Sequence, residues 1–168
     1  MTDEPARDPD ENPYWAEPEP HPDPSLGCIR RGLCCRTSPG WFAPGQAEQA
    51  AAALDMTPDD FVRQYLVIDW IDLPEAGRVH VFAPAKLARD GLPLEPCGEA
   101  VSSLYSHLKG RCIFYLGEPT TPGSPSGCRI YAARPVECAR YDCTHDPALN
   151  LSHRAIALQW QQRADADD

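Results

Sequence analysis

The chain has 168 residues and a formal net charge of −10, with 15 Lys and Arg against 25 Asp and Glu. An acidic chain without a cluster of Lys and Arg is a poor match for a phosphate backbone, so we expect no nucleic-acid partner. No apolar run approaches the roughly 18 residues that span a bilayer, so we expect no membrane partner and a single globular domain.

The N-terminal residues 1–25 are an acidic, proline-rich arm. Residues 1–27 hold eight acidic residues, one arginine and seven of the 19 prolines. Such a segment cannot bury enough apolar surface to fold, so we expect disorder. Its two large apolar residues, Tyr14 and Trp15, are either scattered residues or an anchor for a protein partner. The first residues lack the basic and apolar regions of a signal peptide, which favours a cytoplasmic location.

Helix signals follow in the next part of the chain. Residues 45–54 come after Pro44 and are rich in Ala, Gln and Glu, which predicts a helix. Thr57 can cap a second helix with its hydroxyl, and Pro58 suits the first helical position. Apolar residues then recur at roughly helical spacing, so we predict that this helix covers residues 58–68.

One strand and two further helices complete the expected elements. Residues 78–82 alternate polar and apolar side chains, which predicts a half-buried strand ended by Pro84. A third helix is expected over residues 100–108. A C-terminal helix is expected over residues 152–163, capped by Asn150 or Ser152, with Ile156 and Trp160 on one face. The expected fold is a small, loop-rich α+β domain with several short helices and few strands, divided into the arm 1–25, the domain 26–163 and an acidic tail 164–168.

Eight cysteines lie in the long stretches between these elements. In an oxidising compartment this even number would suggest disulfides, whereas in the cytosol it more often indicates metal or redox chemistry. Cysteine is also a common buried residue, and Cys97, which stands apart in the sequence, is the first candidate for a packing thiol. The others form an N-terminal group, Cys28, Cys34 and Cys35, and a C-terminal group, Cys112, Cys128, Cys138 and Cys143.

Arginine and glycine are concentrated around these cysteines. Seven of the 13 arginines lie close to a cysteine. A guanidinium lowers the pKa of a nearby thiol, and the thiolate is the species that binds metal. The alternative is that arginine is simply common in polar loops. Four glycines next to the cysteines could expose backbone N–H groups to sulfur; they are Gly27, Gly32, Gly110 and Gly127.

Three blocks of the sequence resemble the bacterial YkgJ-type cysteine-cluster family. They are Cys28-x5-Cys34-Cys35-Arg36, then Gly110-Arg111-Cys112-Ile113-Phe114-Tyr115-Leu116, and then Cys128-Arg129-Ile130-Tyr131-x2-Arg134-Pro135-x2-Cys138-x2-Tyr141. That family is described as a zinc- or iron-chelating domain and is sometimes labelled an iron–sulfur oxidoreductase. The resemblance runs from about Gly27 to Cys143.

The resemblance implies a set of metal ligands and one replacement. It maps the family's cluster cysteines to Cys28, Cys34, Cys35, Cys112, Cys128 and Cys138. The family's first block is usually C-x2-C-x2-C-C, and its second cysteine position is Arg31 in this chain. Cys143 or His145 could supply the replacement ligand.

The metal and its role are open at this point. Zinc takes four Cys or His ligands, and an iron–sulfur cluster such as 4Fe–4S takes up to four thiolates, so both fit. Six or seven thiolates exceed one four-coordinate site, which suggests a cluster plus a reactive pair or two metals. We expect a metal-binding protein; the alternatives are an iron–sulfur oxidoreductase and a structural zinc module that presents a protein-binding surface.

A catalytic role has weak support in the sequence. Metal-assisted hydrolysis needs a base near an open coordination position, and four residues are available by sequence distance alone. The common nucleotide-binding, phosphate-binding, zinc-protease and hydrolase signatures are absent. We therefore assign no catalytic residue; the candidates for a base are Glu137, Asp142, His145 and His107.

Overall fold

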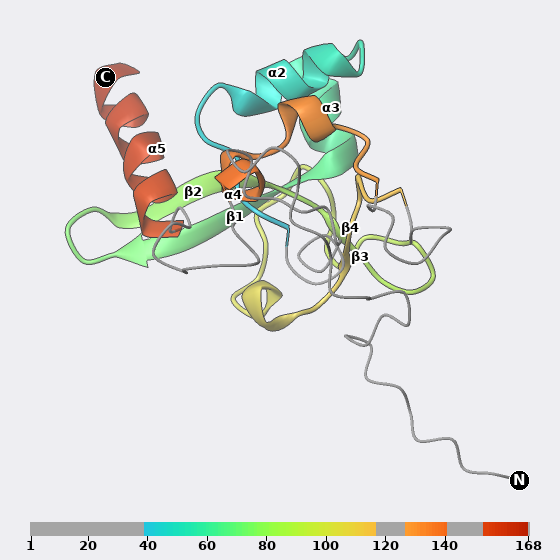
Figure 1. Ribbon diagram of the computed structural model, residues 1–168. Coiled ribbons are helices and arrows are strands. Elements are labelled where there is room, and N and C mark those ends of the chain that lie inside the picture. Colours follow the sequence, from blue (N-terminus) through green and yellow to red (C-terminus); the bar gives the residue numbers. More distant parts are fainter. Residues whose placement is uncertain (1–38, 117–126, 141–152, 168) are drawn as a thin grey trace, which may run out of the picture.

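The structure is a computed structural model that describes residues 39–116, 127–140 and 153–167. Within these residues the fold is α+β, with two small antiparallel sheets of two strands each and several short helices (Figure 1). This confirms the coarse fold class expected from the sequence. The expected arm, residues 1–25, lies outside the described residues.

The first two described helices are α2 (Gln46–Ala53) and α3 (Pro58–Tyr65). The helix predicted over residues 45–54 is confirmed by α2. The cap of α3 is also as predicted, because the backbone N–H of Asp60 donates to Thr57 Oγ1 at 3.2 Å. The predicted end of α3 at residue 68 is wrong, since the helix stops at Tyr65 and the chain continues at once as a strand.

The larger sheet is a hairpin of β1 (Leu66–Leu73) and β2 (Gly77–Pro84). Its register runs from Leu66 opposite Pro84 to Leu73 opposite Gly77. Gly77 has φ of 71°, a left-handed conformation that lets the chain close a short hairpin loop and that a residue with a Cβ adopts at a cost. The predicted strand over residues 78–82 is confirmed as part of β2, whereas β1 was not predicted.

The smaller sheet joins β3 (Lys86–Leu87) to β4 (Arg111–Cys112), with Lys86 opposite Cys112. Between these strands the helix expected over residues 100–108 does not form. Only one short 3-10 turn, η2 (Tyr105–His107), lies there.

The backbone hydrogen bonds explain why that helix is absent. Ala100 makes a parallel bridge to Ile68 of β1, and the N–H of Val101 donates to the Ile68 carbonyl at 3.0 Å. The start of the segment therefore satisfies its backbone groups against the hairpin edge, and these groups cannot also begin a helix.

The C-terminal part contains η3 (Tyr131–Ala133), α4 (Val136–Arg140) and α5 (His153–Asp167). The predicted C-terminal helix is confirmed by α5, which extends into the acidic end of the chain. Its expected caps, Asn150 and Ser152, lie outside the described residues. None of the helices described is long and apolar enough to cross a bilayer.

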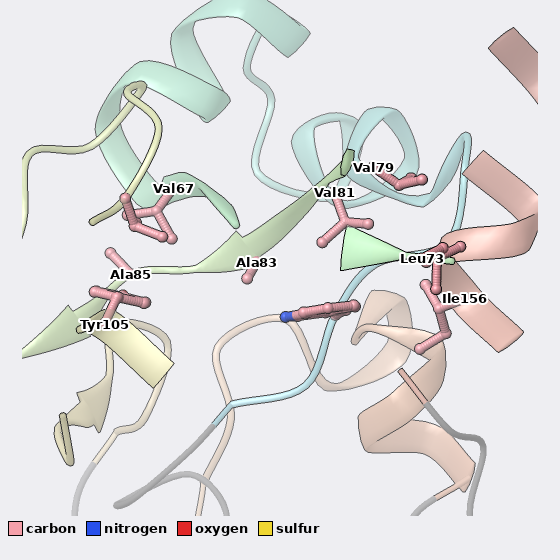
Figure 2. Close-up of a cluster of buried hydrophobic side chains, with 11 residues drawn as sticks. Val67, Leu73, Val79, Val81, Ala83, Ala85, Tyr105 and Ile156 are labelled. Carbon is pink, nitrogen blue, oxygen red and sulfur yellow. The ribbon is translucent and has the colours of Figure 1, made fainter. Parts of the chain in front are cut away.

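The helices and strands pack around two apolar cores. The first core gathers the buried residues of the hairpin with Tyr105 and with Ile156 of α5, which packs against both strands (Figures 1 and 2). Alternate hairpin residues supply it, as the two-residue period of a strand requires: Val67, Leu73, Val79, Val81 and Ala83. The second core joins α2 and α3 to the segments that carry two of the cysteines, and it contains Phe42, Phe61, Leu66, Cys112, Phe114 and Ile130.

Candidate functional site

Cys112 and Cys128 belong to neighbouring segments of the second core. The N–H of Leu116 donates to the Gly127 carbonyl at 3.1 Å, and the N–H of Arg129 donates to the Phe114 carbonyl at 2.8 Å. These bonds hold residues 112–116 beside residues 127–131, although ten residues of sequence separate the two segments. Cys112 is buried and Cys128 is half-buried. Two of the predicted ligands are thus carried by adjacent backbone.

Cys138 lies on α4 against the chain that leads into α2. The backbone N–H of Gly40 donates to Cys138 Sγ at 3.3 Å. A Cβ added at Gly40 would lie 3.0 Å from that sulfur and 2.8 Å from Glu137 Cβ. The close approach therefore needs a glycine at residue 40. An N–H donated to sulfur favours the thiolate over the thiol, which is the state that ligates a metal.

Next to Cys138, the two oxygens of the Glu137 carboxylate lie in different environments. Its Oε1 lies 2.8 Å from His153 Nε2 at the start of α5. Its Oε2 is buried and has no hydrogen-bond partner among the described residues. The His153 ring stacks on Trp41, with ring centroids 3.9 Å apart. Burial opposes protonation of His153, but the hydrogen bond and charge of Glu137 outweigh it, so the pKa of His153 is raised.

Cys97 lies in a different environment from these three cysteines. It packs, half-buried, against the first core and has no place in the second. Burial raises the pKa of the Cys97 thiol, and no arginine is among the causes. The neutral thiol is favoured there, which agrees with the packing role suggested by its isolation in the sequence.

Two of the arginines beside the described cysteines, Arg129 and Arg134, make specific contacts with tyrosines. Arg129 donates to the Tyr65 hydroxyl at 3.1 Å. Arg134 donates to the Tyr131 carbonyl at 2.7 Å and lies over the Tyr131 ring. Arg129 therefore links the segment that carries Cys128 to α3, whereas the Arg134 contact lies within its own segment.

The remaining predicted ligands cannot be placed. Cys28, Cys34, Cys35 and Cys143 lie outside the described residues, as does His145. Within the parts of the chain that are described, no three Cys, His, Asp or Glu side chains come close enough together to hold a metal ion. A complete ligand shell would thus need residues from the first cysteine group or from residues 141–152.

Of the candidate bases, Glu137 and His107 are described. His107 is exposed at the end of η2. Glu137 is engaged with His153, which the sequence analysis did not single out as a functional residue. Asp142 and His145 are outside the described residues.

Compared with known proteins, the chain matches no family model, no curated protein and no solved structure. The resemblance to the YkgJ-type family therefore stays a prediction that rests on the three sequence blocks. The geometry around the described cysteines is the structural basis for the proposal that follows.

Proposed function

We propose that this protein binds zinc or iron through thiolates from its two cysteine groups. The proposed ligands come from Cys28, Cys34, Cys35, Cys112, Cys128, Cys138 and Cys143. The observation that carries the proposal is the setting of Cys138, whose sulfur accepts the Gly40 N–H at 3.3 Å in a contact too tight for any side chain at residue 40. Backbone N–H groups directed at sulfur are typical of thiolates that hold a metal or an iron–sulfur cluster.

The neighbouring carboxylate supports the same proposal. Glu137 Oε2 is buried without a hydrogen-bond donor among the described residues. A buried carboxylate oxygen with no donor is costly, and a nearby cation offsets that cost. A metal held by Cys138 would supply such a cation one residue away along the chain. The chemistry of the donor set, mostly thiolate, suits zinc and iron better than calcium or magnesium.

The role of the bound metal separates two further hypotheses. An iron–sulfur cluster would make the protein a candidate oxidoreductase, as the family resemblance implies, with an unknown substrate. A single tetrahedral zinc would make it a structural module for a protein partner. The thiolate donors accommodate both, so the identity of the metal decides between the two hypotheses.

The test is to purify the full chain without oxygen and to measure metal per chain and the absorption spectrum. Iron with acid-labile sulfide and a broad visible band would select the cluster, whereas a colourless protein with stoichiometric zinc would select the zinc module. A protein that carries neither metal after anaerobic purification and reconstitution would contradict the proposal.

Single substitutions then assign the ligands. We expect serine at Cys28, Cys112, Cys128 or Cys138 to lower metal occupancy, because the shell loses a thiolate. Cys97→Ser is the matched control and should keep full occupancy, since Cys97 packs against the first core. An empty site in Cys97→Ser, or full occupancy in the other four variants, would show that the assignment is wrong.

A further inference from the structure

A second candidate site lies beside the first core, and its lining residue His153 also contacts Glu137, next to Cys138. A cavity of about 280 Å³ is lined by Trp41, Asp69, Trp70, Lys86, Tyr105 and His153, among others. This volume is at the lower end of the range for small-molecule pockets, so it suits a small metabolite. Both polar residues Lys86 and Tyr105 are buried, with 5% and 1% of their surface exposed.

The Lys86 ammonium makes two hydrogen bonds with its three N–H groups. Its Nζ donates to the Tyr105 carbonyl at 3.1 Å and to the Leu108 carbonyl at 2.9 Å. An ammonium has three N–H donors. Besides the two carbonyls, Nζ lies 4.6 Å from the centroid of the Tyr105 ring, and among the described residues it has no third oxygen or nitrogen acceptor and no carboxylate within ion-pair distance. Burial lowers the pKa of Lys86, although the charge of Asp69 opposes this. A buried cation in this state is stabilised by an anion.

Tyr105, which also lines the cavity, offers its hydroxyl as a second donor. Its oxygen accepts the backbone N–H of Lys86 at 2.9 Å. Its own proton finds no acceptor in the part of the chain described. Burial raises the pKa of this hydroxyl, so it stays protonated and able to donate. A buried tyrosine hydroxyl normally has a hydrogen-bond acceptor, and here a ligand could provide it.

Two tryptophans also line the cavity, and both make hydrogen bonds to Asp69. This carboxylate accepts from Trp41 Nε1 at 3.0 Å on one oxygen and from the Trp70 backbone N–H at 2.8 Å on the other. Trp70 is fixed further, because its Nε1 donates to the Val101 carbonyl at 2.9 Å. Since both Asp69 oxygens already accept hydrogen bonds, we assign this residue the role of positioning the Trp41 indole and the Trp70 backbone.

We propose that this pocket binds a small carboxylate with a flat apolar body, whose oxygens accept from Lys86 and Tyr105 and whose body packs against Trp41 and Trp70. A carboxylate presents two acceptor oxygens to the two donors, and its charge balances the buried ammonium. One face of each indole is already covered, that of Trp41 by His153 and that of Trp70 by Arg78, so an aromatic or conjugated acid would pack against the remaining apolar surface of the two rings. The proposal does not depend on the cysteine site.

The test uses the full chain as isolated and benzoate as the probe. Benzylamine and benzyl alcohol carry a similar ring with a positive charge or no charge. Titrations followed by nuclear magnetic resonance read the indole N–H signals of the four tryptophans. We expect benzoate to shift the signals of Trp41 and Trp70 in a saturable way, to leave that of Trp160 in place, and to bind at least about tenfold more tightly than the other two.

Substitution of the two lysines of the chain gives a matched pair. Lys86→Met should raise the Kd for benzoate at least about tenfold, whereas Lys109→Met, at an exposed residue, should leave it unchanged. Because Lys86 also holds two carbonyl groups, Lys86→Met could fail to fold. Tyr105→Phe removes only a hydroxyl and should weaken binding several-fold.

Two results would overturn the proposal. Equal binding of benzylamine and benzoate would show that Lys86 does not select a negatively charged ligand. Unchanged Trp41 and Trp70 signals at millimolar benzoate would show that Lys86 serves only to hold the Tyr105 and Leu108 carbonyls.

Discussion

At the scale of single residues, Gly40 links the cysteine site to the body of the fold. The backbone at this residue approaches Cys138 so closely that its N–H reaches the sulfur. Among the described glycines with a tight environment, Gly40 is the one whose neighbours belong to a proposed ligand and to the half-buried Glu137. An alanine there would collide with main-chain and Cβ atoms, which cannot move as freely as the end of a long side chain.

We therefore predict that Gly40→Ala lowers the free energy of unfolding by about 1–3 kcal/mol, the usual cost of forcing an extra methyl group into a packed region. It should also lower metal content, because the Cys138 sulfur must shift. Gly45→Ala is the control: Gly45 has φ of 85° and open space around it, so the cost is backbone strain of about 1–2 kcal/mol with metal content intact. Urea unfolding and metal analysis measure both. Full metal content in Gly40→Ala would contradict the argument.

At the scale of elements, the starts of the helices were easier to predict than their ends. Thr57 and Pro58 identify the first turn of α3 by local chemistry that operates within four residues. No glycine or proline marks the change from α3 to β1 at Tyr65 and Leu66, and the apolar residues there fit a helix as well as a strand. Pairing with β2 decides the outcome, and that partner lies more than ten residues further along the chain.

The helix expected over residues 100–108 failed for the same reason. The composition of the segment allows a helix, but Val101 finds its acceptor in Ile68 of β1. Lys86 illustrates the same limit for the candidate pocket. It lies in an apolar stretch of the sequence, yet only the fold brings the Tyr105 and Leu108 carbonyls to its ammonium. Local sequence signals thus predicted helices with a capping residue, but they could not predict contacts between segments that are distant in the sequence.

Helix α5 is held against the rest of the fold by identifiable side chains. Ile156 is fully buried in the first core, and Trp160 packs edge-on against Phe82. We predict that Ile156→Ala lowers the free energy of unfolding by about 2–5 kcal/mol and Ile156→Val by about 0.5–1.5 kcal/mol, in proportion to the volume lost. Gln159→Ala on the exposed side should be nearly neutral. Chemical denaturation of the three variants measures this, and equal effects at residues 156 and 159 would exclude the docking that we describe.

At the scale of the whole molecule, the two apolar cores bury different parts of the chain. The first core consists of the hairpin, α5 and Tyr105 and has only Cys97 among the described cysteines at its edge. The second includes Cys112 and has Cys128 packed against it. The sequence grouped Cys112 with Cys128 and set Cys97 apart, because spacing and neighbouring arginines distinguish them. It carried no information on which core each would join, since core membership depends on strand pairing.

This division predicts how the protein responds to loss of metal. If thiolates near the second core hold zinc or iron, a chelator removes a source of folding free energy from that side of the molecule. Amide hydrogen exchange should then accelerate in residues 112–116 and 127–131, while β1 and β2 keep their protection, because the first core does not contain the proposed ligands. Returning the metal should restore the slow exchange, and Cys97→Ser should behave as the native chain does. Unchanged protection around Cys112 and Cys128 after the metal has left would show that the second core stands without it, and equal loss of protection in the hairpin would show that the two cores unfold as one unit.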